Sequence, residues 1–197
     1  MTTAIIHYNA GNIQSVLFAL ERLGVQAIVT SNAEGISKAD KIIFPGVGEA
    51  STAMQWLKTH QLDRLISSLK QPVLGICLGM QLLCDFSEEN NTNCLGVFDG
   101  VRVKKFQAGD PGLKVPQVGW NTIFNLKSSV LKHVSEQSYC YFVHSYYAPL
   151  SNYSIATADY IQPYSAALQK DNFTGVQFHP EKSAGAGDQI LKNFLSN

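Results

Sequence analysis

Two kinds of hydrophobic pattern alternate through the first half of the chain. Short apolar runs followed by turn residues predict strands at residues 4–8, 25–29, 41–44 and 73–76. Between them, apolar residues recur at helical spacing and predict helices at residues 13–23, 49–57, 62–69 and 78–86. Gly24 follows the first of these helices, at a position where glycine commonly ends a helix.

This strand–helix–strand order favours a mostly parallel sheet that is covered by helices. Ligands of such sheets bind at the carboxyl ends of the strands. In the second half, short apolar runs between turn residues predict antiparallel or mixed strands at residues 96–106, 122–126, 139–143, 154–158, 166–169 and 175–178. A last helix is expected at residues 186–195. The sequence shows no repeat or linker, so we expect one α/β domain over residues 1–197.

The composition narrows the class of protein. Of the 197 residues, 45% are hydrophobic and 15% are charged, which is typical of a chain that folds around a core. The formal net charge is zero, so nothing indicates binding to nucleic acid or to an anionic membrane. Such a balance is compatible with an oligomer or a standing partner. We see no signal peptide and no apolar run near the ~20 residues of a membrane span, and we expect a cytoplasmic protein.

The four cysteines, Cys77, Cys84, Cys94 and Cys140, form no CxxC pair. This spacing argues against a structural zinc site, and the apolar composition argues against a disulfide framework. Only Cys77 stands in a reactive setting, and the other three are expected to be bland, buried thiols.

The segment GICLG (75–79) joins a predicted strand to a predicted helix and has the form of a nucleophile elbow. Small residues two before and two after Cys77 relieve crowding at such a turn. A helix N-terminus favours the thiolate, which is the reactive form of a group whose usual pKa is about 8.5. The backbone N–H of Leu78 would supply half of an oxyanion hole. From this segment alone, a buried structural cysteine is an equally open interpretation.

The segment GVQFHPE (175–181) is an apolar strand that runs into a polar loop. It places His179 at a strand end and Glu181 at a spacing that can fold back onto the imidazole. A cysteine nucleophile needs a base, and the base needs a third group that holds its tautomer. Most histidines are surface or satisfied core residues. That interpretation applies to His7, His60 and His133, and it stays open for His144.

Two segments together resemble the class I (triad) glutamine amidotransferase family. They are PVLGICLGMQLL (72–83) and GVQFHPEKS (175–183), and the pair in this order is highly specific. The resemblance implies a catalytic triad of Cys77, His179 and Glu181. It also implies a flavodoxin-like three-layer sandwich with a central, mostly parallel sheet between helices.

Four further segments carry a closer resemblance, namely YNAGNIQSV (8–16), PGVGEA (45–50), VPQVGWN (115–121) and YFVHSYY (141–147). They are similar to the glutaminase subunits of imidazole glycerol phosphate synthase, an enzyme of histidine biosynthesis. Anthranilate-type relatives usually carry a DNYDSF-like motif near the N-terminus and GHQ after the elbow. The chain departs from the closer family at His7 and at Gln117-Val118, and these changes are expected to alter the surface that faces the partner.

The resemblance implies hydrolysis of the glutamine side-chain amide through a thioester on Cys77, without a metal or organic cofactor. It implies an oxyanion hole built from the Val47 and Leu78 N–H groups. The two glycines around Val47 would let its peptide turn towards the site or away from it. The implied glutamine-binding residues are Gly46, Gly48, Gln81, Ser145 and Tyr146.

The resemblance also implies a heterodimer with a (β/α)8 cyclase subunit. Ammonia would pass to that subunit, which would make imidazole glycerol phosphate and an aminoimidazole carboxamide ribotide. The acceptor substrate would bind the partner, because this chain has no phosphate-binding loop. Trp120 is either an anchor on the docking face or a core residue, and the two interpretations have equal weight.

Three alternatives remain open from the sequence. The first is the same glutaminase chemistry with another acceptor, in an amidino-sugar, pyridoxal phosphate or chorismate-derived pathway. The second is a cysteine peptidase-like hydrolase on a similar sheet, which would not need Gln81 or Glu181. The third is a non-catalytic binding subunit, which loss of a triad residue would mark, and no triad residue is lost.

Overall fold

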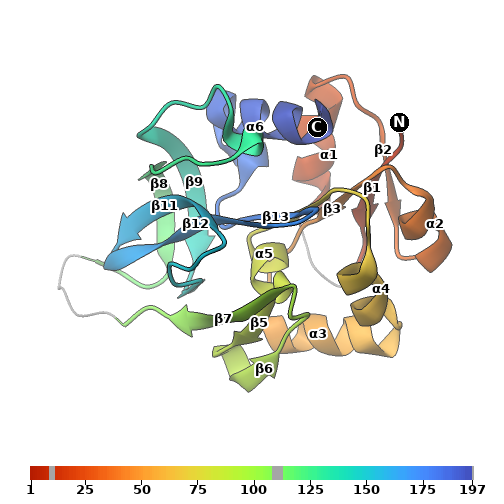
Figure 1. The fold of residues 1–197 in the computed structure, drawn as a ribbon, viewed down its shortest axis with the longest axis horizontal. Helices are drawn as coiled ribbons and strands as arrows, with labels where there is room; N and C mark the ends of the chain where they lie inside the picture. The colour runs from red at the N-terminus through yellow and green to blue at the C-terminus, as the bar shows by residue number, and fades with distance from the viewer. Residues whose placement is uncertain (9–11, 108–112, 197) are drawn as a thin grey trace.

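The computed structural model describes residues 1–8, 12–107 and 113–196 (Figure 1). A seven-stranded sheet with the order β11-β12-β13-β4-β3-β1-β2 lies at its centre. Its five strands from β2 to β13 are parallel, and β12 and β11 extend it in antiparallel fashion. The strands are β1 (Thr3–Ile6), β2 (Ala27–Thr30), β3 (Lys41–Phe44), β4 (Val73–Ile76), β11 (Ser154–Tyr160), β12 (Gln162–Lys170) and β13 (Phe173–Val176).

Helices cover both faces of this sheet (Figure 1). One face carries α1 (Ile13–Arg22) and α6 (Ala184–Ser196). The other face carries α3 (Ala50–Thr59), α4 (Leu62–Ser68) and α5 (Leu78–Leu83), and α2 (Ala33–Lys38) flanks the β2 end. The strand order 2-1-3-4-13 matches the flavodoxin-like order, so the α/β three-layer prediction is confirmed.

The buried residues of the strands alternate between two hydrophobic clusters. Ile5 of β1 packs into the cluster that contains Leu20 of α1 and Ile190 of α6. Its neighbours Ala4 and Ile6 pack into the cluster formed with α3, α4 and α5. Successive side chains of a strand point to opposite faces, so the near-continuous apolar strands reflect burial on both sides.

Gly24 ends α1 as the sequence predicts. Its φ is +74°, and its N–H donates to the Glu21 carbonyl at 2.9 Å. The Val25 N–H donates to the Leu20 carbonyl, also at 2.9 Å. The two bonds form a Schellman motif, which satisfies carbonyls that the end of the helix leaves free.

Two smaller sheets lie beside the central one. The first has the order β10-β7-β5-β6, with strands β5 (Cys84–Ser87), β6 (Thr92–Asn93), β7 (Phe98–Lys105) and β10 (Tyr146–Tyr147). The second is the hairpin of β8 (Gln117–Ile123) and β9 (Ser138–His144). Three short 3-10 helices complete the described elements: η1 (Glu89–Asn91), η2 (Ser129–Leu131) and η3 (Pro180–Lys182).

The prediction of one helix over residues 78–86 is wrong. The helix α5 stops at Leu83, and β5 starts at Cys84, because Cys84 and Phe86 pair with β7. Cys84 is fully buried. Helix α2 was not predicted, and β8 begins at Gln117 rather than at Thr122 because β9 sets its register.

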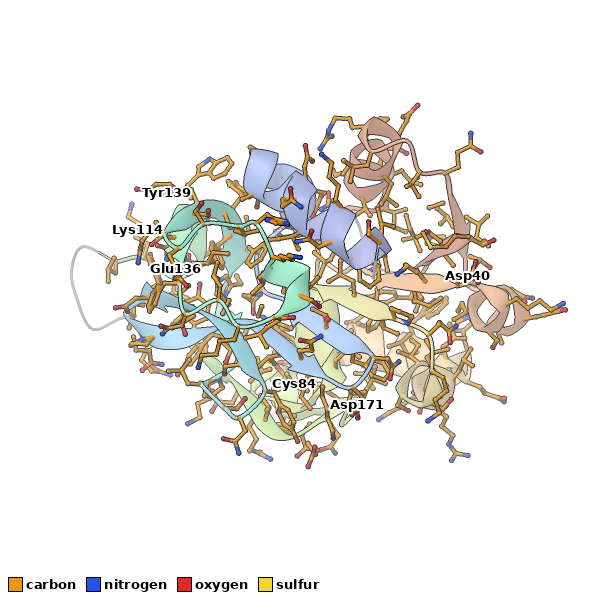
Figure 2. All side chains as sticks on the ribbon, turned by 45° about the horizontal axis from the view of Figure 1, so that its top comes forward. Asp40, Cys84, Lys114, Glu136, Tyr139 and Asp171 are labelled. Atoms are coloured by element: carbon orange, nitrogen blue, oxygen red, sulfur yellow. The ribbon has the colours of Figure 1, made fainter. Side chains whose placement is uncertain are left out.

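None of the helices formed by the described residues is long and apolar enough to cross a membrane. Charged groups such as Asp40, Lys114 and Glu136 lie at the periphery of the molecule (Figure 2).

Candidate active site

The two predicted reactive segments meet because their strands are neighbours. In the register of β4 and β13, Gly75 pairs with Gly175 and Ile76 with Val176. Cys77 directly follows β4, and His179 lies just beyond the end of β13. Parallel strands end at the same edge of a sheet, so the thiol and the imidazole face one pocket.

Cys77 has the backbone of a nucleophile elbow. Its φ of +52° and ψ of −108° are unusual for a residue with a side chain. A Cβ on Gly79 would lie 1.9 Å from the Phe44 carbonyl oxygen, so only glycine allows the elbow to sit this close to β3. The backbone N–H of Cys77 donates to the Val176 carbonyl at 2.8 Å and ties the elbow to β13.

His179 is buried, and Glu181 and Asn12 hold the Nδ1 side of its ring. Its Nδ1 lies 2.8 Å from Glu181 Oε1, and the side-chain amide of Asn12 donates to the same carboxylate oxygen. Burial lowers the pKa of His179, but its hydrogen bonds with Cys77 and Glu181 outweigh burial and hold that pKa well above its usual value. The contact with Glu181 occupies Nδ1, so Nε2 is the nitrogen left for the thiol.

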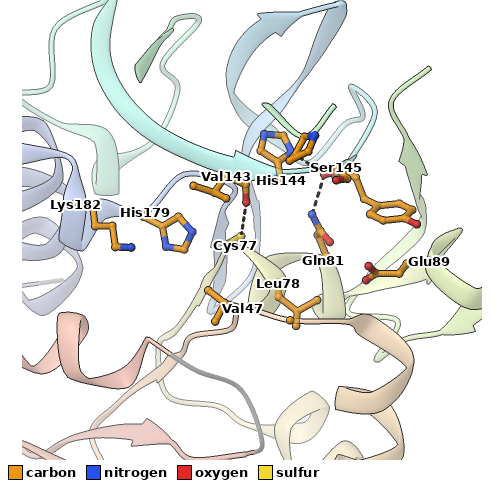
Figure 3. Close-up of a pocket in the computed structure, with 13 residues that line it drawn as sticks. Val47, Cys77, Leu78, Gln81, Glu89, Val143, His144, Ser145, His179 and Lys182 are labelled. Carbon is orange, nitrogen blue, oxygen red and sulfur yellow. Dashed lines mark hydrogen bonds between the residues drawn. The ribbon is translucent and has the colours of Figure 1, made fainter. Parts of the chain in front are cut away.

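A pocket of about 330 Å³ opens over Cys77 (Figure 3). This volume suits a small amino acid. Most residues predicted for the site line it, but Gly46 and Glu181 do not, and Glu181 contacts the lining residue His179. The lining residues are Val47, Gly48, Cys77, Leu78, Gln81, Glu89, Pro116, Val143, His144, Ser145, Tyr146, His179 and Lys182.

The two N–H groups predicted for an oxyanion hole are not assembled in this structure. The backbone N–H of Leu78 donates to the Gly46 carbonyl oxygen at 3.3 Å. A trans peptide points its C=O and N–H in opposite directions, so the Val47 N–H faces away from Leu78. The φ of Gly48 is +123°, and the Tyr8 hydroxyl fixes the start of the loop by donating to the Pro45 carbonyl at 2.6 Å.

Several residues at the site were not singled out by the sequence, among them Glu89, Gln177 and Asn12. Glu89 lines the pocket, burial raises the pKa of its carboxyl, and its Oε2 accepts the Ala50 N–H at 2.7 Å. Gln177 is fully buried beside the thiol. Asn12 belongs to the motif at residues 8–16, which could have indicated it. Asn9, Ala10 and Gly11 of that motif lie outside the described residues.

The structure supports a structural role for His144. Burial lowers the pKa of its imidazole to about 4, so the ring is neutral. Its Nδ1 lies 2.7 Å from the Tyr146 carbonyl oxygen and holds the loop that carries Ser145. Gln117 is buried and accepts the Tyr164 hydroxyl at 2.9 Å, so its expected effect on a partner-facing surface is wrong. Val118 of the same pair is exposed.

Among the residues that the structure describes, no group of three or more His, Cys, Asp or Glu side chains could hold a metal ion. The thiol of Cys77, the imidazole of His179 and the carboxylate of Glu181 lie in series at the site. Such a series can attack a carbonyl carbon and move the displaced proton to a leaving group.

The model of the glutamine amidotransferase class-I family matches residues 4–197. The chain belongs to this family. Among its curated relatives, imidazole glycerol phosphate synthase subunit HisH of Bacteroides fragilis is 58% identical, and the match covers 99% of each chain. The subunit of the same name from Vibrio parahaemolyticus is 44% identical over 97% of this chain and 96% of its own.

Solved structures of glutamine amidotransferases share the fold of this family member. One has a TM-score of 0.76 at 16% identity and covers all of this chain and 98% of its own. Another, from Thermotoga maritima, has a TM-score of 0.64 at 15% identity and covers all of this chain and 83% of its own.

Proposed function

We propose that this chain is the glutaminase subunit of imidazole glycerol phosphate synthase in histidine biosynthesis. The observation that carries the proposal is the line from Cys77 through His179 to Glu181 beneath a pocket of about 330 Å³. The family match and the relatives at 44–58% identity over nearly the full length support the same enzyme.

In the proposed reaction, Cys77 Sγ attacks the carboxamide carbon of glutamine while His179 takes the thiol proton. The tetrahedral intermediate collapses to a thioester, and His179 returns the proton to the departing ammonia. Water then attacks the thioester with His179 as base, and glutamate leaves with the thiol restored. Glu181 orients the imidazole and stabilises its charged form.

The remaining pocket residues would hold the substrate. Gln81, Ser145 and Tyr146 line the pocket, and Figure 3 shows Gln81 and Ser145 on the wall opposite His179, where they can contact the amino-acid end of glutamine. Glu89 adds a carboxylate to this wall. A partly buried carboxylate is a good partner for the α-ammonium group of glutamine, because a hydrogen bond between two charged groups is stronger than one between neutral groups.

The proposed partner is a (β/α)8 cyclase subunit, and one face of the β8–β9 hairpin supports such docking. Val118 and Trp120 on β8 pair with Val143 and Tyr141 on β9, and Tyr139 extends the same face. We call these five residues the hairpin face. Trp120 is 53% exposed and Val118 is 61% exposed, so the core interpretation of Trp120 is wrong. Val143 also lines the pocket, so a subunit on this face would lie beside the ammonia source. We place the complex in the cytoplasm.

Coexpression with the cyclase subunit tests the proposal. The purified complex should release one glutamate for each imidazole glycerol phosphate formed from glutamine. Glutamate release without any coupling to a cyclase would refute the pathway, and absence of glutamine hydrolysis would refute the chemistry.

A further inference from the structure

Gln177 is a buried amide between the pocket wall and the sulfur. It directly follows β13, is fully buried, and its backbone N–H donates to the Ala166 carbonyl at 2.8 Å. Its side-chain Nε2 lies 3.6 Å from Cys77 Sγ. Its Oε1 accepts from Gln81 Nε2 at 2.9 Å.

Hydrogen-bond accounting fixes which end of the Gln177 amide faces the sulfur. Gln81 Nε2 donates to the Tyr146 backbone carbonyl at 2.9 Å, and a carbonyl can only accept. The Gln81 NH2 group therefore faces the Tyr146 carbonyl with one N–H, and its second N–H points at Gln177. That N–H needs an oxygen, so Gln177 presents Oε1 to Gln81 and its own NH2 group to Cys77.

We propose that Gln177 is a further catalytic residue, which donates its amide N–H to Cys77 Sγ and stabilises the thiolate. This inference rests on the proposed role of Cys77 as the nucleophile. A hydrogen bond to an anionic sulfur is stronger than one to a neutral thiol, so the donor shifts the balance towards the thiolate. On another side, the Val143 carbonyl oxygen lies 3.7 Å from Sγ and can only accept, so it favours the thiol.

The arrangement also links the substrate side of the pocket to the nucleophile. Gln81 lines the pocket, and Gln177 connects it to the sulfur through one amide group. Substrate contacts that fix the side chain of Gln81 would also fix the Gln177 amide that donates to the sulfur. Loss of Gln81 should therefore destabilise the thiolate relative to the thiol, although Gln81 acts on the sulfur only through Gln177.

Gln177→Glu keeps the shape and an acceptor for Gln81 but removes the amide donor, and it also places a carboxylate beside the sulfur. Iodoacetamide alkylation of the full chain is followed against pH, and mass spectrometry of the Cys77 peptide separates it from the other cysteines. We expect the midpoint of alkylation to rise by about one pH unit or more, which is a roughly tenfold slower reaction below the midpoint. Gln169→Glu makes the same chemical change on β12, outside the pocket, and should leave the midpoint unchanged.

Two further variants add no charge, so they separate loss of the donor from repulsion of the thiolate, and they serve also if Gln177→Glu does not fold. Gln177→Met fills the space without a donor, and Gln81→Met leaves Gln177 in place but removes the partner that fixes its amide. Both should raise the midpoint. A folded Gln177 variant with the wild-type midpoint, changed only in thermal stability or in KM for glutamine, would reduce Gln177 to a packing residue. Alkylation needs no glutamine turnover, so this outcome is distinct from a failure of the proposed glutaminase activity.

Discussion

The backbone N–H of Leu78 donates its hydrogen bond to the carbonyl oxygen of Gly46. The N–H that should stabilise a developing oxyanion is therefore engaged within the protein, and a carbonyl dipole points into the place that the oxyanion would need. Rotation of the Gly46–Val47 peptide would free Leu78 and bring the Val47 N–H inward. Glycines on both sides of Val47 keep the cost of this rotation modest.

We predict that the isolated chain is a poor glutaminase and that its partner with bound acceptor activates it. A partner that binds the rotated peptide about 3 kcal/mol more tightly would raise the rate roughly a hundredfold. Steady-state glutamate release, with and without partner and acceptor, measures the effect. Full activity of the isolated chain would eliminate the peptide switch and leave the triad untouched.

Cys77→Ala should abolish glutamine-dependent synthesis by the complex. The same complex should still form product from an ammonium salt, because the proposed cyclisation site lies on the partner. Cys94→Ala is the matched control, since Cys94 lies outside the pocket and should leave both activities unchanged. Glutamine turnover that survives Cys77→Ala would show that the nucleophile is another group.

Glu181→Gln should slow glutamine hydrolysis less than His179→Ala does. In a serine protease triad, loss of the orienting carboxylate costs about 10⁴-fold in kcat and loss of the base about 10⁶-fold. The same order follows here because Glu181 contacts His179 and does not line the pocket. Single-turnover kinetics of thioester formation compare the two variants, and small, equal effects would be incompatible with the triad.

Glu89→Gln should raise KM for glutamine about tenfold with a smaller change in kcat. The variant keeps the shape of the side chain but removes the charge that would pair with the α-ammonium group. Glu88→Gln is the control, because Glu88 holds the Lys105 N–H at 2.8 Å and does not line the pocket. An unchanged KM in the Glu89 variant would remove Glu89 from the substrate site.

Trp120→Ala should weaken the complex with the cyclase subunit while the isolated chain stays folded. Loss of a central tryptophan anchor costs about 2 kcal/mol or more, which is roughly a thirtyfold weaker Kd. Leu150→Ala provides the control, because Leu150 is similarly exposed but lies outside the hairpin face. Titration calorimetry with both variants decides the matter, and equal affinities would rule out a docking role for Trp120.

The sequence predicted the central sheet well because its strands are short, apolar and bounded by turn residues. The predicted strand at residues 41–44 and the predicted strand at residues 73–76 match β3 and β4 residue for residue. Gly24 was recognisable because its helix cap needs a positive φ. The end of α5 was not predictable, because the apolar spacing typical of a helix continues to Phe86. The strand β5 starts at Cys84 because it pairs with β7, and this pairing cannot be read from the local sequence.

The site was predictable only in part, for a related reason. Cys77, His179 and Glu181 lie in two short segments whose residue types indicate a nucleophile, a base and an orienting carboxylate. Glu89 and Gln177 have ordinary surroundings in the sequence, and their proposed roles come from their positions, Glu89 in the pocket lining and Gln177 buried beside the thiol. The orientation of the Gly46–Val47 peptide depends on one backbone hydrogen bond, which no residue pattern encodes.

The strand β13 joins the central sheet between β4 and β12, although it is the last strand of the chain. Gln177 and Cys77 are 100 positions apart, so the ribosome makes the thiol long before it makes the group beside it and the base that follows. Until β13 inserts next to β4, a nascent chain holds a cysteine without its imidazole. The proposed triad can therefore form only after β13 has been synthesised and has paired with β4, which makes this late pairing step a condition for any glutaminase activity.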